Sequence, residues 1–203
     1  MTPRRPRARR REVIVFTEGE ATEVSYVDAI KVLLHGFVVR VDDRHGDPET
    51  LVRLAVAEKR RRDRLARQEA APPEETPLIW CMFDRDQHPK VDMLIRQAID
   101  AGIGVAFSHP CFELWLLLHF RDHGAPEAGI CAGLVDAVEA HIPGFRRRGK
   151  RVTLANLSDG YPSARDRARA LVKRHERDGL VVPTQRDPST SVEEFVEALG
   201  ITY

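Results

Sequence analysis

The sequence lacks the features that would assign it to a membrane or a secretory pathway. No apolar run approaches the ~20 residues that a membrane-spanning helix requires. The basic start, MTPRRPRARRR, is not followed by the apolar stretch of a secretory signal. We therefore expect a cytoplasmic protein with no membrane partner.

Cysteine is scarce, which argues against a thiolate metal site and a disulfide scaffold. The three cysteines, Cys81, Cys111 and Cys131, are widely spaced, and no CxxC pair or Cys/His spacing typical of zinc occurs. Cys81 lies inside an apolar run and Cys111 lies next to one, so we expect both to be small buried hydrophobes. A disulfide is not expected in a cytoplasmic protein.

The chain also lacks an excess of one charge, since its formal net charge is +1. The basic residues are nevertheless gathered in three blocks, at positions 4–11, 59–67 and 146–151. Such blocks are often solvated faces, but three of them in a small chain are compatible with a phosphate-rich partner. The candidate nucleic-acid-binding residues are Arg60, Arg61, Arg147 and Lys150.

What the chain does contain is an alternation of short apolar runs and helical patterns. The runs at 13–16, 37–41, 78–83 and 103–107 are typical of buried strands, and LIWCMF at 78–83 indicates a central one. Helical patterns over 23–34, 48–71 and 91–101 separate them. The β-α-β-α-β-α-β order predicts an α/β fold with a parallel four-stranded sheet and right-handed crossovers.

The alternation stops after residue 108. Helical patterns follow at 111–120, 127–141, 163–177 and 192–199, the last one introduced by a DPST capping signal in which Ser189 and Thr190 are expected to cap the helix. We expect a basic, disordered arm (1–11), an α/β core (12–110) and a helical extension (111–203) that packs on the core to form one structural unit.

Acidic residues follow two of the predicted strands. Glu18 follows the first strand, and Asp84 and Asp86 follow the third. Ligands of parallel α/β sheets bind beyond the carboxyl ends of the strands, so these acids should meet at one edge. Several close carboxylates stay ionised only if a cation balances them, and hard oxygen ligands favour Mg²⁺ or Mn²⁺.

Each acid also has a simpler interpretation. A single Asp after a strand is most often a turn or capping residue, and Glu23 would complement the dipole of the next helix. Asp84 or Asp86 would pair with Arg85. The combination of an acid after strand one and a DxD after strand three is what favours a metal site.

Four motifs carry a resemblance to a known family. TEGEATE at 17–23, FDRDQHP at 83–89, SHPCFELWLLLHF at 108–120 and RDPSTSV at 186–192 resemble the RloB family of restriction-linked prokaryotic proteins, with Asp187 in place of the Asn of the last motif. The resemblance implies a Toprim-like (Rossmann-like) core, in which Glu18 matches the Toprim glutamate and Asp84 and Asp86 match the DxD.

The resemblance also implies further site residues. Glu23 resembles the helix acid of the nuclease branch, and Glu113 lies in the RloB block itself, where an acid among apolar residues is costly to bury unless it is paired or bound to a cation. His88 would contact phosphate or transfer a proton, or would be a plain turn histidine before Pro89. The implied reaction is metal-dependent hydrolysis of phosphodiester bonds.

Three functions remain open at this stage. The first is a nuclease acting against phage or foreign nucleic acid, with an ATPase partner implied by the family setting and with homo-oligomer formation left open. The second is a non-catalytic module that binds nucleic acid or a partner protein. The third, a receiver-like Mg²⁺ domain, is disfavoured because no lysine follows a fifth strand. DNA and RNA substrates, tRNA included, are equally compatible with the sequence.

Overall fold

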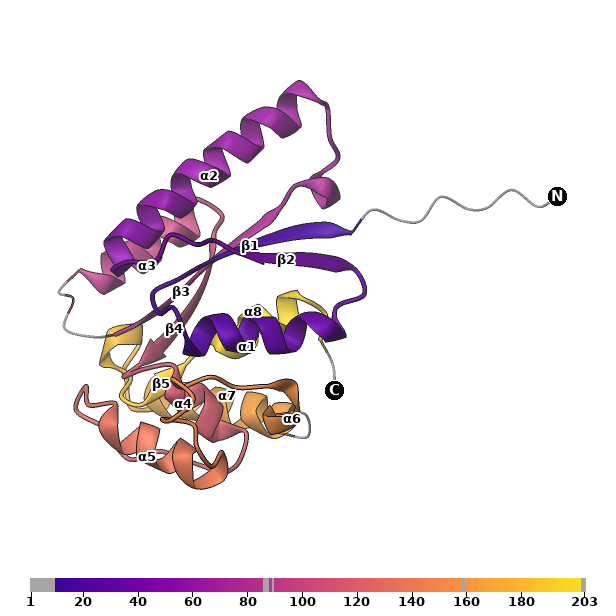
Figure 1. The fold of residues 1–203 in the computed structure, drawn as a ribbon. Helices are drawn as coiled ribbons and strands as arrows, with labels where there is room; N and C mark the ends of the chain where they lie inside the picture. Colours follow the sequence, from indigo (N-terminus) through magenta and orange to yellow (C-terminus); the bar gives the residue numbers. More distant parts are fainter. Residues whose placement is uncertain (1–9, 86–87, 89, 158–159, 202–203) are drawn as a thin grey trace.

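The computed structural model describes residues 10–85, 88, 90–157 and 160–201. Within them, five strands form one sheet in the order β2-β1-β3-β4-β5 (Figure 1). The strands are β1 (Arg11–Thr17), β2 (Phe37–Val41), β3 (Leu78–Asp84), β4 (Gly104–His109) and β5 (Ser189–Thr190). The α/β class is therefore confirmed.

The four long strands run parallel, as their apolar sequences predict. Alternate side chains of a strand point to opposite faces, so Val13 and Val15 enter one hydrophobic core while Ile14 and Phe16 enter the other. A strand buried on both faces cannot show an apolar–polar alternation, which explains the unbroken apolar run of β3.

One face of the sheet is covered by α2 (Pro48–Gln68) and α3 (Val91–Asp100) (Figure 1). Asp47 caps α2, because its carboxylate accepts the Thr50 N–H at 2.9 Å, and Pro48 occupies the first helical position. Leu51, Val52 and other apolar residues of the first half of α2 are buried. The second half of α2 is highly charged and much more exposed.

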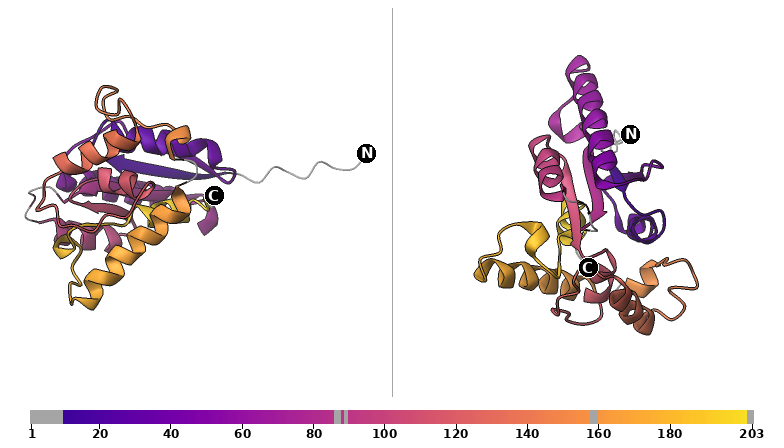
Figure 2. Two further views of the ribbon diagram at one scale, coloured as in Figure 1. Left: turned by 90° about the horizontal axis from the view of Figure 1, so that it is seen from below. Right: turned by 90° about the vertical axis from the view of Figure 1, so that its left-hand side faces the viewer.

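The other face is covered by α1 (Thr22–Ile30) and α8 (Val192–Ala198). The remaining helices gather at the side of the molecule away from α2 (Figure 2) and share the core of α1 and α8. They are α4 (Glu113–Leu118), α5 (Ala132–His141), α6 (Leu154–Leu157) and α7 (Tyr161–Arg177). Short 3₁₀ turns lie at Lys31–Leu33 (η1), Pro73–Glu75 (η2) and Pro183–Gln185 (η3).

The prediction of a purely parallel, four-stranded sheet is wrong. β5 pairs antiparallel with the end of β4, aligning Thr190 with Ser108 and Ser189 with His109. The two hydroxyls of Ser108 and Thr190 lie 3.0 Å apart, and both side chains are buried. A two-residue strand has too little apolar pattern to be detected in the sequence.

Ser189 and Thr190 therefore act chiefly as a strand rather than as a helix cap. The Thr190 hydroxyl still accepts the N–H of Val192, the first residue of α8. The predicted helix over 127–141 begins only at Ala132. Its expected first turn is absent because Ala128 and Gly129 have positive φ values of 52° and 75°, which a right-handed helix does not allow. The backbone N–H groups of Glu127 and Ala128 donate to the Asp187 carboxylate.

The predictions for the cysteines are partly confirmed. Cys81 is buried as expected, and burial raises the pKa of its thiol to about 12. Cys111 is also buried as expected, but the expectation that the chain has no disulfide is wrong, since Cys111 and Cys131 form one. The two residues lie 20 positions apart, and nothing in their spacing indicated that the fold would bring them together.

None of the helices in the described ranges is long and apolar enough to cross a bilayer.

Glu193, in the first turn of α8, generates a prediction about stability. Only 4% of this residue is exposed, its Oε2 has no hydrogen-bond partner among the described residues, and burial raises the pKa of its carboxyl to about 8. The unfolded chain releases this proton near its ordinary pKa, so the folded state loses stability as pH rises from about 4.5 to about 8.

Glu193→Gln should therefore stabilise the protein by on the order of 2 kcal/mol at pH 8.5, and by much less at pH 5. The free energy of unfolding in urea at the two pH values measures this. Glu74→Gln, at an exposed position, is the control and should change little at either pH. An equal effect of Glu193→Gln at both pH values would contradict the interpretation.

Candidate active site

The ends of β1 and β3 bring two of the predicted acids together. The pairing aligns Thr17 with Met82, and the Glu18 N–H donates to the Met82 carbonyl at 3.0 Å. The Glu18 side chain then turns back across the sheet edge, where its Oε2 accepts the backbone N–H of Asp84 at 3.0 Å. The expected convergence of Glu18 and Asp84 is thus observed.

Glu23 joins this group from the start of α1. Its Oε1 accepts the N–H of Gly19 at 3.3 Å, and only 6% of the residue is exposed. A side chain at position 19 would begin 2.4 Å from Glu23 Oε2. Gly19 is therefore required for Glu23 to pack against the turn that carries Glu18.

Glu113 reaches the same place from the C-terminal part of the chain. It is the first residue of α4, is 4% exposed, and lies within 3.4 Å of the Thr22 hydroxyl. The Lys150 ammonium lies 3.1 Å from Glu113 Oε1. Glu113 is thus buried with a partner, as the cost of burying a carboxylate requires.

Lys150 is placed by the loop between α5 and α6. Its φ of 60° follows the left-handed Gly149 (φ 66°), and its N–H donates to the carbonyl of the buried Phe145 at 2.8 Å. Two residues later, the Val152 N–H donates to the Ser25 hydroxyl of α1 at 3.1 Å. This loop is therefore fastened to the helix that carries Glu23.

These side chains surround one cavity of about 340 Å³. Five chain segments build it: the β1–α1 turn, the end of β3, the start of α4, Cys131 before α5, and the α5–α6 loop. The charged residues that line it are Glu18, Glu20, Glu23, Asp84, Glu113 and Lys150. The disulfide between Cys111 and Cys131 forms part of the wall.

The carboxyl groups that line the cavity are buried and lie close together, and this affects their pKa values. Burial raises the pKa of Asp84 well above its ordinary value, and the charges of Glu23, Glu113 and Glu18 raise it further. A hydrogen bond from the Phe112 N–H opposes this rise. Burial, together with the charge of Glu113, also raises the pKa of Glu23, which Lys150 partly lowers.

The other predicted site residues are placed as follows. His88 Nε2 lies 3.7 Å from Glu18 Oε1, and the His88 side chain is 38% exposed. Arg147 is exposed on the loop that carries Lys150, whereas Arg60 and Arg61 lie on α2 and do not line the cavity. Asp86 lies outside the described residues.

The sequence did not point to three features of the cavity. Thr22 and the Phe112 N–H contact the acids, and the disulfide closes one side. Thr22 lies inside the EGEATE motif, so its position was a usable signal. The Phe112 contact and the disulfide depend on tertiary structure and left no signal in the sequence.

The donor chemistry of the cavity suits a hard divalent cation, because every acid in it offers oxygen ligands. Among the described residues, no group of three or more His, Cys, Asp or Glu side chains is already arranged to hold a metal ion. The second aspartate of the DxD lies outside those residues.

A comparison with protein families assigns the chain. The family model described as RloB-like protein matches residues 13–199. The chain belongs to the RloB-like family. No curated protein and no solved structure matches this RloB-like chain. The match spans all the chain segments that build the cavity, from Glu18 to Lys150.

The crowding of acids predicts an effect of Asp84→Asn on the metal-free protein. Because burial and the neighbouring acids raise the pKa of Asp84, the fold disfavours its ionised form, and its amide should raise the Tm at pH 7 in EDTA. Adding Mn²⁺ should raise the Tm of the wild-type protein by mass action and that of the variant much less.

Differential scanning fluorimetry with EDTA and with Mn²⁺ measures both effects. Asp43→Asn, at an exposed position outside the cavity, is the matched control and should behave as the wild type. A lower Tm of Asp84→Asn in EDTA, combined with an unchanged Mn²⁺ response, would contradict a cation-requiring acid cluster.

Proposed function

We propose that this RloB-like protein is a metal-dependent hydrolase of nucleic-acid phosphodiester bonds. The observation that carries the proposal is the meeting of Glu18, Asp84, Glu23 and Glu113 with Lys150 around one cavity. The resemblance of Glu18 and the 84–86 pair to the glutamate and DxD of Toprim domains supports the same reaction.

Mg²⁺ or Mn²⁺ would be held by Glu18 and Asp84, with Asp86 and Glu23 as further ligands. When bound, such an ion polarises the scissile phosphate and lowers the pKa of an attacking water. Asp84 remains oriented by the hydrogen bond between its N–H and the Glu18 carboxylate. Glu18 would also be placed to accept the proton of the attacking water.

Two further groups would stabilise the negative charge that develops on the phosphate and on the leaving oxygen. Lys150, whose ammonium already lies beside Glu113, neutralises a non-bridging phosphate oxygen when substrate enters. His88, at the exposed side of Glu18, donates a proton to the leaving oxygen. Glu113 positions Lys150 rather than contacting the substrate.

Cleavage is favoured over simple binding because the side chains that line the cavity are mostly negatively charged. A protein that only grips phosphate has no use for several buried carboxylates, since they repel the ligand. Action against phage or foreign nucleic acid, with an ATPase partner, remains a prediction from the family resemblance. The cytoplasmic location is a prediction from the sequence, with which a homo-oligomer is compatible.

Cleavage of labelled DNA and RNA panels in Mg²⁺ or Mn²⁺ tests the proposal. Glu18→Gln and Asp84→Asn should each lower the rate by on the order of 10²-fold or more, a loss comparable to that of one transition-state contact. Excess EDTA should abolish cleavage in the wild-type protein.

Thermal unfolding of each variant shows whether it is folded, and Asp43→Asn serves again as the charge-matched control. Cleavage that persists in EDTA, or in either folded variant, would reject the mechanism. Tight binding of the same oligonucleotides without any cleavage, with or without an added ATPase, would favour the non-catalytic module instead.

A further inference from the structure

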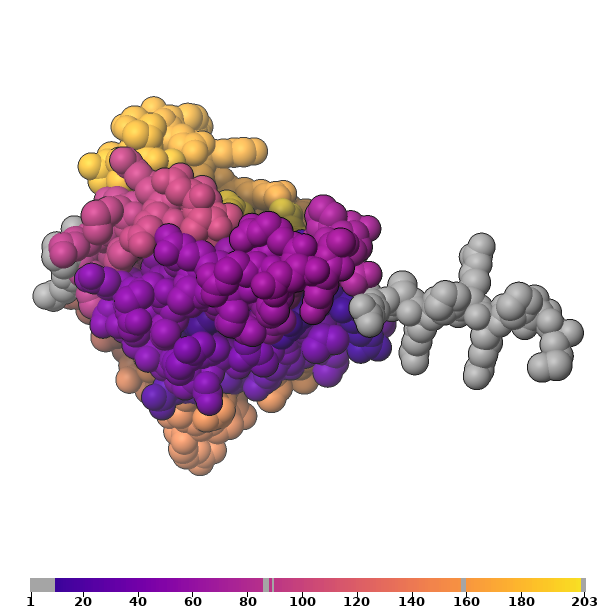
Figure 3. Space-filling view, turned by 90° about the horizontal axis from the view of Figure 1, so that it is seen from above, coloured from indigo at the N-terminus to yellow at the C-terminus, as the bar shows by residue number. Residues whose placement is uncertain are grey.

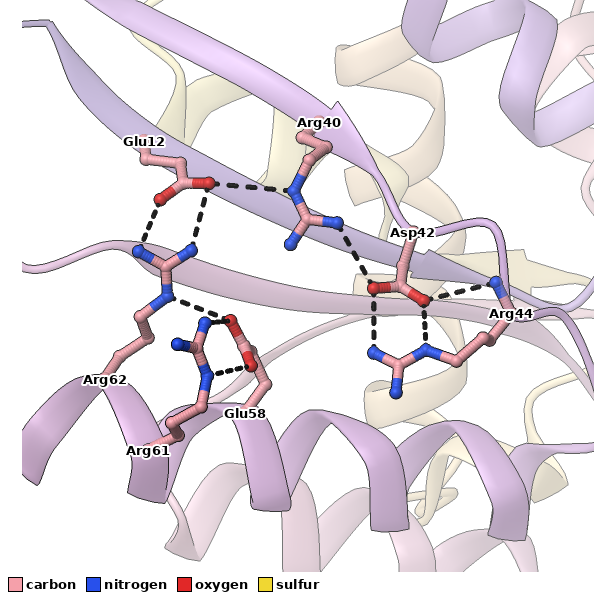
Figure 4. Close-up of polar contacts among 7 residues, drawn as sticks. All are labelled: Glu12, Arg40, Asp42, Arg44, Glu58, Arg61 and Arg62. Carbon is pink, nitrogen blue, oxygen red and sulfur yellow. Dashed lines mark hydrogen bonds and ion pairs between the residues drawn. The ribbon is translucent and has the colours of Figure 1, made fainter.

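The basic residues of α2 fall into two sets. Those of the first set are neutralised: Lys59 pairs with Asp63, Arg61 with Glu58, and Arg62 with both Glu58 and Glu12. Figure 4 shows the guanidinium groups of Arg61 and Arg62 turned toward these carboxylates on the side of α2 nearest β1 and β2. These residues offer little free positive charge.

The second set consists of Arg53, Arg60, Arg64 and Arg67. All four are exposed, and none forms an ion pair with an acid of the described residues. Their spacing of seven, four and three residues places them within roughly 60° of one another around the helix axis. We call this set the arginine stripe.

The stripe has the dimensions of a phosphate track. From Arg53 to Arg67 a helix rises about 21 Å. A nucleic-acid strand carries one charge per ~3.4 Å of duplex axis, so the stripe passes about six phosphates. Arg96 of α3 is exposed and shares a surface hollow of about 460 Å³ with Arg60, which widens the basic surface, although Asp100 also lines that hollow.

The stripe is on the exposed side of α2, which covers the face of the sheet opposite α1 and α8. Figure 3 shows the molecule from the side on which α2 lies. α2 begins at the carboxyl edge of the sheet with its capping Asp47. The hydrogen bond from the Thr50 N–H is the main cause that lowers the pKa of Asp47, and the nearby His88 lowers it slightly further. His88 in turn lies 3.7 Å from Glu18. A nucleic-acid strand bound along the stripe would therefore reach the vicinity of the acid cavity.

We propose that the arginine stripe binds the phosphate backbone of nucleic acid, without base specificity. The inference goes beyond cleavage, since it concerns a separate surface that does not line the cavity. Regularly spaced guanidinium groups match a repeating polyanion. A membrane surface fits less well, because the apolar face of α2 is buried on the sheet and Leu65 is its one exposed large apolar residue.

Binding to labelled single-stranded and duplex oligonucleotides tests this, measured by fluorescence anisotropy in EDTA over a range of salt concentrations. The stripe variant is R53Q/R60Q/R64Q/R67Q. The plot of the logarithm of the binding constant against the logarithm of the salt concentration has a negative slope, and the variant should make it shallower by about 2–4. The variant should also weaken binding by tenfold or more in low salt. The charge-preserving R53K/R60K/R64K/R67K should keep the wild-type slope.

The matched control removes four charges from α7, as R165Q/R169Q/K173Q/R177Q, and should change the slope by less than about 1. Circular dichroism establishes that each variant keeps its helices. A stripe variant with the wild-type slope, or an equal loss in the α7 control, would overturn the proposal. So would wild-type binding to anionic vesicles or acidic peptides but not to oligonucleotides. Because EDTA prevents cleavage, failure of the nuclease proposal leaves this test intact.

Discussion

The repulsion between carboxylates at the carboxyl edge of the sheet is the constraint on which the site depends. The register of β1 and β3 places the Glu18 side chain against the Asp84 N–H, and the turn at Gly19 brings Glu23 beside them. Burial raises the pKa of Asp84 and Glu23, and the charges of the neighbouring carboxylates raise it further. Folding alone does not favour this arrangement, so we infer that it is kept for a cation.

The helices that follow β4 enclose the acids. α4 carries Glu113 to the cavity, while the α5–α6 loop carries Lys150 and is fastened to α1 through Val152 and Ser25. The disulfide ties the start of α4 to the start of α5 and lines the same cavity. The Lys150 ammonium neutralises only part of the negative charge of the cavity's carboxylates. A divalent cation would neutralise the remainder.

Much of the fold could be predicted from the sequence because it depends on local patterns. The apolar runs of β1 and β3 and the capped start of α2 follow from residue type and spacing alone. The adjacency of Glu18 and Asp84 followed from the parallel topology. The two-residue β5, the disulfide and the contact between Lys150 and Glu113 did not, because each joins segments distant in sequence without a periodic signal.

The most direct test of the central claim is a calorimetric titration of the metal-free protein with Mn²⁺ at pH 7, in two buffers of different ionisation enthalpy. If the acids share protons that a cation must displace, Mn²⁺ should bind and release protons, so the observed heats should differ between the buffers. Absence of Mn²⁺ binding, or binding with identical heats in both buffers, would contradict the account.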